Sequence, residues 1–376
     1  MKILLVGEYS NVHWTLAEGL RSLGHEVTVV SDGDVWKNFR RDIDIRRRSL
    51  GKFDTMRYLW RLRRLWPRLK GYDIVQLINP VFLDLRAERI WPYYEQLRRQ
   101  NRKMVLGAFG IDYYWVLEGM KPDTFRYSDF YLDGQLRHNR WNDGMVSEWL
   151  NGAKGALCQR VANDCDHIVS GLYEYDICYK PHFPDKTTFI PYPIVIKATR
   201  EEAADRLLRP DGSLSRPIRF FIGIQKTRHE YKGTDIMLRA LERLKADYSD
   251  RVDIVRAENV PYETYQHMIE HSDVLLDQLY SYTPAMNGLL AMARGMVLVG
   301  GGEEEHYQLL DEPALRPIVN VTPSEADVYA KLEQLVLHPE ELGRRQREGL
   351  EFVGKHHDHI EVARRYAALY DSILHD

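Results

Sequence analysis

The chain has 376 residues and a formal net charge of -3, with 44% hydrophobic and 28% charged residues. This length favours two domains of ordinary size, and the composition is typical of a globular protein rather than a disordered one. The nearly balanced charge gives no overall attraction to nucleic acid, and no stretch approaches the ~20 apolar residues of a membrane span.

The three cysteines, Cys158, Cys165 and Cys178, are odd in number and lack Cys-x-x-Cys spacing. They fit reduced thiols in a cytosolic protein, and we expect no structural zinc site.

The first elements are a strand, a helix and a second strand, expected over residues 2–7, 12–23 and 26–31. The first strand is continuously apolar, as in a sheet covered on both faces, and the three elements are typical of an α/β domain. The intervening loop lacks Gly-x-Gly-x-x-Gly, so the fingerprint of a dinucleotide-binding domain is missing.

An arginine-rich segment runs from Arg40 to Lys70. Within it, five apolar residues recur at helical spacing. Such a helix can lie on an anionic membrane surface as a peripheral contact, or it can pack its apolar side on the sheet with the arginines in solvent. The sequence leaves both interpretations open. The five apolar residues are Tyr58, Leu62, Leu65, Trp66 and Leu69.

A long segment, residues 113–150, follows an expected strand over residues 103–108 and is aromatic, polar and irregular. Insertions at the carboxyl end of a strand are where α/β sheets place ligand contacts. The other elements of the first half are expected at residues 73–78, 84–101, 152–165, 167–170 and 188–190.

Residues 194–217 are charged and punctuated by Pro and Gly, which is typical of an interdomain crossing. A second alternation of strands and helices begins after it, so the sequence predicts an α/β fold with two Rossmann-like, doubly wound domains facing a cleft. We place the domains at residues 1–195 and 196–360, with a C-terminal helix of about residues 360–376 packing back on the first. Strands are expected at 218–222, 252–256, 274–277, 296–299 and 317–321, and helices after 232, at 262–272, at 288–295 and from 324 onward.

A basic loop separates the strand over residues 218–222 from the next helix. It starts at Gly223, and either Thr234 or Asp235 can cap the helix after Gly233. Unpaired N–H groups and cationic side chains at a helix start suit a phosphate group, although a basic surface loop without a ligand fits the same pattern. The loop does not have the spacing of a Walker motif. Its basic residues are Lys226, Arg228, His229 and Lys232.

This order of elements resembles the GT-B glycosyltransferases, in particular the large retaining group (glycosyltransferase group 1, family 4-like) that uses nucleotide-sugar donors. Gly223…Lys232-Gly233-Thr234-Asp235 is similar to the Gly-Arg…Lys-Gly-x-Asp element of that group. A second similar block is Asp273-Val274-Leu275-Leu276-Asp277-Gln278 followed by Leu289-Leu290-Ala291-Met292-Ala293-Arg294-Gly295-Met296-Val297.

The chain departs from the group at several positions. Two glutamates eight residues apart are replaced by Tyr282 and Leu290, and the arginine beside the glycine is Ile224. A histidine at the end of a first-domain strand is replaced by Phe109, with Asp112 three residues on. Three acidic residues after a triple glycine, which lets a ligand approach the backbone, are candidates for the ribose contact or form a solvated loop: Glu303, Glu304 and Glu305.

The resemblance implies that Lys232 and Arg228 stabilise the diphosphate leaving group, so that no metal or other cofactor is required. Asp112 contacts the sugar or the acceptor, or else caps its loop. Asp42 and Asp44 have metal-motif spacing, which we interpret as incidental. The expected donor and nucleotide contacts are Gly223, Lys226, Gly233, Asn259, Val260, Asn287, Gly288 and the three glutamates. The expected acceptor-side residues are Gly7, Tyr9, Ser10 and Asn11.

The sequence thus predicts a glycosyltransferase (a hexosyltransferase-type enzyme) of surface polysaccharide synthesis, acting on a glycan or lipid-linked acceptor. We expect it in the cytoplasm, with a peripheral position on the inner membrane face as an option. Two alternatives stay open, a degenerate GT-B binding protein and a sugar-nucleotide epimerase, because a fold does not fix a function.

Overall fold

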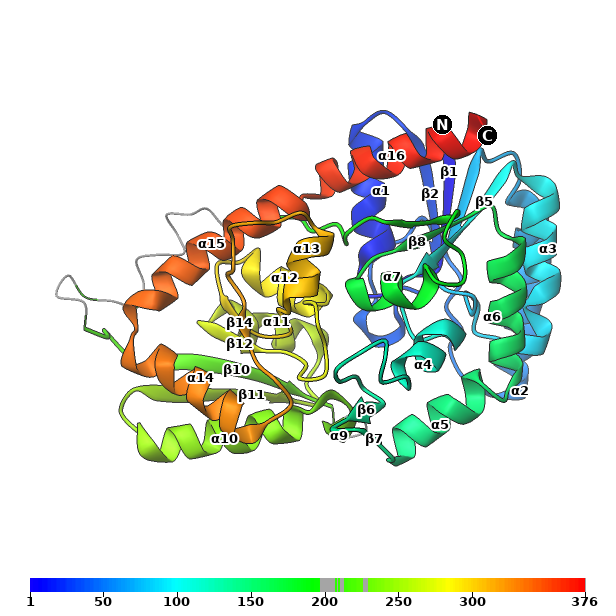
Figure 1. Ribbon diagram of the computed structural model, residues 1–376. Coiled ribbons are helices and arrows are strands. Elements are labelled where there is room, and N and C mark those ends of the chain that lie inside the picture. Colours follow the sequence, from blue (N-terminus) through cyan, green and yellow to red (C-terminus); the bar gives the residue numbers. More distant parts are fainter. Residues whose placement is uncertain (197–206, 208, 210–212, 226–228, 376) are drawn as a thin grey trace. The chain divides into compact units, whose positions relative to one another are not determined.

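The computed structural model describes residues 1–196, 207, 209, 213–225 and 229–375, and the chain forms two compact units (Figure 1). The crossing between the units at Pro193–Ile194 falls beside the expected boundary at residue 195, and residues 119–143 belong to the second unit by their contacts. The first unit comprises Met1–Glu118, Gly144–Pro193 and His359–Asp376, and the second comprises Gly119–Asp143 and Ile194–Asp358.

The first unit is built on a seven-stranded parallel sheet in the order β3-β2-β1-β4-β5-β8-β9. The apolar strand β1 is central, with Leu4 opposite Thr28 on β2 and Val75 on β4, and its residues from Ile3 to Val6 are fully buried. A sheet covered on both faces explains why this strand is apolar throughout. The strands are β1 (Lys2–Val6), β2 (Glu26–Ser31), β3 (Ile43–Asp44), β4 (Ile74–Leu77), β5 (Lys103–Ala108), β8 (His167–Ser170) and β9 (Thr187–Phe189).

Helices cover this sheet, and the last of them is the final helix of the chain, α16 (Figure 1). They are α1 (Val12–Ser22), η1 (Val35–Lys37), α2 (Lys52–Leu65), η2 (Trp66–Arg68), η3 (Ala87–Arg89), α3 (Trp91–Gln100), α4 (Tyr113–Gly119), α5 (Arg140–Trp149, which begins in the second unit), α6 (Ala153–Asp164), α7 (Tyr173–Tyr179) and α16 (His359–His375).

The last helix, α16, lies beside α1 in the first unit (Figure 1). The two helices cross closely at Gly19, where an added Cβ would come 2.7 Å from Cβ of Ala363. Farther along α16, the Tyr370 hydroxyl donates to Oε1 of buried Gln76 on β4 over 2.8 Å. The final residues of the chain therefore complete the core of the domain that the first residues begin.

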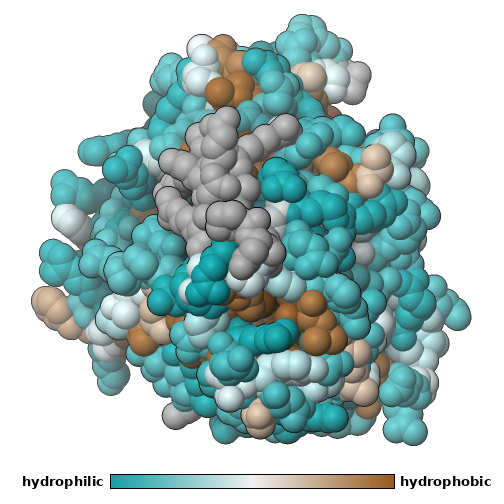
Figure 2. Space-filling model, turned by 90° about the vertical axis from the view of Figure 1, so that its left-hand side faces the viewer, coloured by the Kyte–Doolittle hydropathy of each residue, from teal (hydrophilic) through white to brown (hydrophobic). Residues whose placement is uncertain are grey.

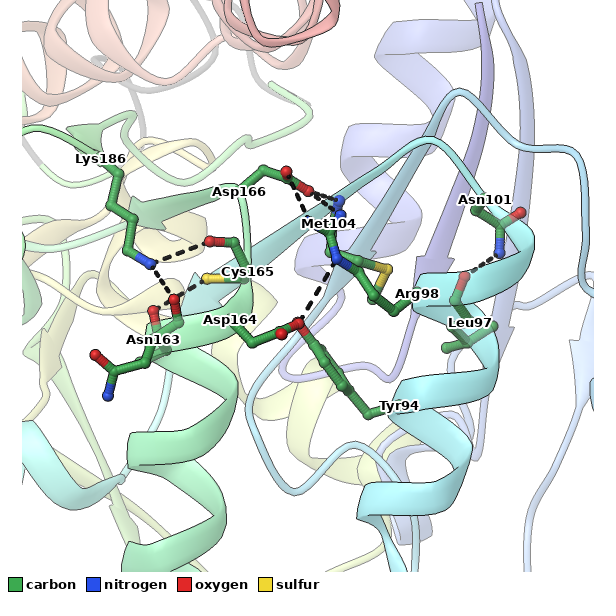
Figure 3. Close-up of polar contacts among 11 residues, drawn as sticks. Tyr94, Leu97, Arg98, Asn101, Met104, Asn163, Asp164, Cys165, Asp166 and Lys186 are labelled. Atoms are coloured by element: carbon green, nitrogen blue, oxygen red, sulfur yellow. Dashed lines mark hydrogen bonds and ion pairs between the residues drawn. The ribbon is translucent and has the colours of Figure 1, made fainter.

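A polar cluster closes the amino ends of β5 and β8 (Figure 3). Asp166, directly before β8, accepts hydrogen bonds from Arg98 on α3 and from the Met104 backbone N–H on β5. Tyr94 donates to Asp164 over 2.7 Å, and Lys186 donates to the carbonyl oxygen of Cys165 over 3.0 Å. These contacts join two helices to the sheet at the edge opposite its loop-bearing carboxyl ends.

The second unit is built on a five-stranded parallel sheet in the order β11-β10-β12-β13-β14. With the first sheet, it confirms the predicted α/β class of two Rossmann-like, doubly wound domains. The strands are β10 (Ile218–Ile224), β11 (Val252–Glu258), β12 (Val274–Leu276), β13 (Val297–Gly300) and β14 (Val319–Asn320). The helices are α9 (His229–Lys232), α10 (Thr234–Asp247), α11 (Tyr262–Glu270), α12 (Met286–Met292), α13 (Glu304–Leu309), α14 (Glu325–Leu337) and α15 (Glu340–His356).

The segment over residues 113–150 is more regular than we expected. It contains α4, a hairpin of β6 (Tyr131–Leu132) and β7 (Gln135–Leu136), and α5. The hairpin turn is Asp133-Gly134, with both residues at positive φ, which suits a tight two-residue turn. The aromatic side chains that made the segment look irregular are partly used for packing, as buried Phe125 and Phe130 show.

The surface has two features that bear on membranes. Within the described parts of the chain, we find no helix with both the length and the apolar character needed to cross a bilayer. On the face shown in Figure 2, apolar residues lie in separate areas within a mainly hydrophilic surface.

Candidate functional site at the second sheet

The carboxyl ends of the second sheet bring together most of the predicted donor residues. Because the strands are parallel, the chain leaves β10 after Ile224, β11 before Asn259, β12 before Asp277 and β13 before Gly301, all at one edge. In open α/β sheets this edge is where ligands bind. The predicted Lys226 and Arg228 lie outside the described residues.

Gly233 forms the corner between α9 and α10. It has φ +69° and is itself the N-cap of α10, so the prediction that Thr234 or Asp235 caps this helix is wrong. An added Cβ at Gly233 would come 2.7 Å from Cβ of Leu279, and the Leu279 N–H donates to the Lys232 carbonyl over 3.0 Å. Only glycine fits this tight, left-handed corner, which fixes Lys232 beside the start of a 14-residue helix.

Asp277, directly after β12, is the acidic centre of this edge. Burial raises its pKa, and the nearby Lys232 lowers it. Asn287 on α12 lies 3.5 Å from the carboxylate through Nδ2, and its Oδ1 accepts a hydrogen bond from Tyr265 over 3.1 Å. The arrangement combines a cation, a carboxylate, an amide and a phenol, which can hold the diphosphate and hydroxyl groups of a nucleotide.

Four further predicted donor residues occupy the same edge. An added Cβ on Gly288 would lie 3.3 Å from Oδ2 of Asp277, and one on Gly223 would lie 3.1 Å from the Tyr265 ring. Asn259, at the end of β11, is exposed and has φ +52°, with the half-buried Val260 following it. A non-glycine residue held at positive φ stores strain of the kind that clusters at functional sites.

The three glutamates after β13 begin a helix, and each has a protein partner. Glu303 is the N-cap residue of α13 and accepts hydrogen bonds from Arg126, Tyr127 and Asn320. Glu305 pairs with the same Arg126. Glu304 pairs with Arg316, whose Nη2 lies 2.8 Å from Oε1 of Glu304. The interpretation of this stretch as a solvated acidic loop is therefore wrong.

Tyr282 anchors the segment that carries Arg126. Its hydroxyl accepts the Arg126 backbone N–H over 2.7 Å, and its buried ring contacts the rings of Phe125 and Tyr127. The Arg126 guanidinium lies 5.0 Å from the centroid of the same ring. An aromatic anchor therefore occupies the place where the resemblance would put a glutamate.

The triple glycine after β13 does not leave open space for a ligand at each residue. An added Cβ on Gly301 would meet the Ser281 carbonyl oxygen at 2.1 Å, and one on Gly302 would meet Cβ of Ile318 at 2.8 Å. We expected these glycines to let a ligand approach the backbone. This is wrong at Gly301 and Gly302, where neighbouring parts of the chain occupy the space beside the backbone.

The predicted acceptor-side loop follows β1 in the first unit. Gly7, Ser10 and Asn11 all have positive φ, and the Ser10 N–H donates to Asp34 over 2.8 Å. Half-buried Tyr9 packs its ring against Gly110, where an added Cβ would lie 2.8 Å from it. Two consecutive left-handed non-glycine residues are costly, so this loop is strained as well as predicted to bind.

Asp112 is fully buried in the first unit. Its carboxylate accepts hydrogen bonds from the Trp115 N–H over 2.9 Å and from the Tyr179 hydroxyl over 2.7 Å. Burial raises the pKa of Asp112 to about 7, although these two bonds act in the opposite direction. These contacts are those of a loop cap, the second of the two roles that we considered for it.

Several residues of the site were not predicted as such. Asp277 could have been found, because it directly follows an apolar strand run, where ligand contacts gather. Tyr265 and Arg126 carry no local signal, since only the folded chain brings them to this edge. Among the described residues, no group of three or more His, Cys, Asp or Glu side chains is arranged to hold a metal ion.

No family model matches the sequence, and no curated protein matches it either. Solved structures do match over nearly the whole chain. Sucrose-phosphate synthase from Thermosynechococcus elongatus has 14% identity and a TM-score of 0.59, with 99% of each chain covered. Anabaena HepE, solved with UDP and glucose, has 11% identity and a TM-score of 0.58, covering 99% of this chain and 100% of its own.

WaaG, described as a glycosyltransferase involved in lipopolysaccharide biosynthesis, has 12% identity and a TM-score of 0.57, with 98% and 99% of the chains covered. A UDP-GlcNAc 2-epimerase from Neisseria meningitidis is similar to a lesser degree, at 11% identity and a TM-score of 0.52 with both chains fully covered. At these identities the likeness concerns the fold, and the chain has the α/β fold with two Rossmann-like domains of GT-B glycosyltransferases.

Proposed function

We propose that the protein is a glycosyltransferase that moves a sugar from a nucleotide-diphosphate sugar to a glycan or lipid-linked acceptor. The observation that carries this proposal is the meeting of Lys232, Asp277 and Asn287 at the carboxyl edge of the second sheet. In a chain with a GT-B fold, this edge is the natural donor side. A surface-polysaccharide role is the finer part of the proposal, supported by the likeness to WaaG.

Lys232 has the central chemical role in this proposal. Breaking the anomeric bond leaves negative charge on a diphosphate, and a fixed cation at the start of α10 stabilises that charge. Arg228 is proposed as a second cation, so the reaction would need no metal. Asn287 and Tyr265 would orient the nucleotide, and Asn259 with Val260 would meet its base. We propose a retaining outcome on the resemblance alone.

The first test is binding of UDP, GDP and ADP by calorimetry to the wild type, Lys232→Ala and Lys331→Ala. Lys331 is an exposed lysine of the same unit, so its variant is the matched control. We expect Lys232→Ala to weaken binding about tenfold or more, because a hydrogen bond between charged groups contributes about 1.5–3 kcal/mol. Equal affinity of all three proteins would remove Lys232 from the site.

The second test is turnover with a panel of nucleotide sugars. Transfer to an acceptor or slow donor hydrolysis supports a transferase. Conversion of the donor sugar without an acceptor would instead support an epimerase, an activity named for one structural neighbour.

A binding protein without catalysis is the second candidate function. The observation that favours it is the aromatic anchor at Tyr282, with Leu290 at the other expected glutamate position. Wild-type protein that binds no nucleotide, or binds one without any turnover of the sugar panel, would favour this candidate.

A further inference from the structure

The helix α2 has two apolar faces, and only one of them is used for folding. The row that the sequence suggested as a membrane face is buried in the first unit, with Tyr58 2% and Leu62 0% exposed. The packing interpretation is therefore right for that row. A different row is exposed, with Phe53 80%, Met56 69% and Trp60 59% accessible.

Helix geometry places the two rows on opposite sides. Residues spaced by three, four or seven positions share one face of a helix, so Phe53, Met56 and Trp60 form one stripe. Tyr58 and Leu62 lie about half a turn away. A helix on a domain surface needs one apolar stripe to pack, so the exposed stripe has no role in holding α2 to its unit.

The charge around this stripe is one-sided. Ile45 to Tyr72 contains ten basic residues and one acidic residue, in a chain whose net charge is -3. The Arg64 guanidinium lies 4.4 Å from the centroid of the Trp60 ring, at the edge of the stripe. Among the described residues, only Arg47 of these ten basic side chains forms an ion pair, with Asp84.

We propose that this surface, the exposed stripe of α2 with the basic residues around it, docks the protein on an anionic lipid bilayer. Aromatic and apolar side chains enter the headgroup boundary, while arginines bind lipid phosphates and keep their charge in the interface. Each cation near an anionic bilayer adds about 1 kcal/mol, or about a fivefold change in partitioning. The combination of an exposed apolar row and surrounding cations fits a lipid surface better than a folded acidic partner, which would bind the charges alone.

A second exposed apolar pair extends the argument toward the predicted acceptor loop. Val35 and Trp36 are 63% and 53% exposed, in the η1 turn after β2. Lys37, at the end of this turn, donates to the Ser10 hydroxyl over 3.1 Å. A lipid-linked acceptor would thus meet a loop beside a second exposed apolar turn, a corollary that rests on the proposed function, whereas the docking itself does not.

The test is flotation of the full-length protein with phosphatidylcholine vesicles that contain or lack phosphatidylglycerol. We expect binding to the anionic vesicles alone, weakened by high salt. The triple variant F53S/M56S/W60S should lose at least about tenfold in partitioning, and R57E/R63E should lose a similar factor. All five positions are exposed, so the variants should fold, which circular dichroism checks.

Matched controls place the same changes elsewhere. L136S/L337S removes two other exposed leucines, and K331E/R347E reverses two other exposed charges. Both controls should bind vesicles like the wild type. Nucleotide affinity of the triple variant should be unchanged, which separates failure of docking from failure of the proposed chemistry.

Three results would overturn the proposal. The first is a wild type that does not bind anionic vesicles, and the second is a triple variant that binds as the wild type does. The third is a wild type that does not bind vesicles but sediments as a dimer, together with a triple variant that sediments as a monomer. The stripe would then bind a second copy of the chain.

Discussion

Replacing Gly233 by alanine tests the geometry of the proposed donor site most directly. A non-glycine residue at its φ of +69° costs about 1–2 kcal/mol. The added Cβ would also lie 2.7 Å from Cβ of Leu279, well inside the ~3.5–4.0 Å of a normal carbon contact. Overpacking of this kind costs about 1–3 kcal/mol, so the total is about 2–5 kcal/mol.

Gly134→Ala is the matched control, because Gly134 belongs to the same unit and has φ +78°. Its added Cβ would have only the Tyr131 hydroxyl nearby, at 4.0 Å. The change should therefore lower the free energy of unfolding only by the cost of the left-handed backbone, about 1–2 kcal/mol.

The assay is urea unfolding followed by circular dichroism, with hydrogen exchange of peptides from α10 to locate the effect. A loss of about 2–5 kcal/mol in the free energy of unfolding is large against the ~5–15 kcal/mol stability of a typical protein. We also expect nucleotide affinity to fall in Gly233→Ala and to stay constant in Gly134→Ala. If Gly233→Ala proved no more destabilising than Gly134→Ala, the tight corner at Lys232 would be an incorrect description.

Two further predictions concern the glutamate cluster and the buried acid. Arg126→Ala should lower the free energy of unfolding by only about 1 kcal/mol, because Arg126 is more than half exposed. In a double-mutant cycle, its coupling energy with Glu303→Gln should be about 0.5–1 kcal/mol. A coupling energy of zero, measured by urea unfolding, would contradict the pairing. Asp112 has a pKa raised by burial to about 7, so its folded state holds the proton between pH ~4 and ~7 while the unfolded state releases it. Wild-type stability should therefore fall relative to Asp112→Asn as the pH rises through this window, and parallel pH profiles of the two proteins would refute the assignment.

The fold was predictable because its signals are local. Apolar runs that end at a glycine or a polar residue became strands at nearly the predicted bounds, as β5 (Lys103–Ala108) and β8 (His167–Ser170) show. Parallel pairing follows once helical patterns separate such runs.

The polar partners in the candidate site were not predictable from local sequence. The contact between Arg126 and Glu303 joins residues 177 positions apart, and nothing near either residue indicates the other. The sequence shows both apolar rows of α2, but which row is buried depends on the sheet beneath it. For the row with Tyr58 and Leu62 we left open whether it meets a membrane or packs on the sheet; it is buried, whereas the exposed row contains Phe53 and Trp60.

The same strand edges explain part of the family resemblance in physical terms. In four places within the described residues, an aspartate directly precedes a strand and accepts the backbone N–H of a residue on the neighbouring strand, which fixes the register of the pair. One of them, Asp273, is the first residue of the block that resembles glycosyltransferases, and its carboxylate also accepts hydrogen bonds from the Arg216 guanidinium. The four pairs are Asp42 with Val29, Asp73 with Lys2, Asp166 with Met104 and Asp273 with Arg219.

These aspartates all lie at amino ends, whereas the left-handed residues Ser10, Asn11 and Asn259 all follow carboxyl ends. One edge of each sheet is thus closed by satisfied carboxylates, and the other holds strained loops. Similarity to a family at Asp273 therefore reports how the sheet is built, while Lys232 and Asp277 report what the open edge can bind. An inference of function from this chain has to rest on the second kind of residue, since a protein that had lost its activity would keep the first.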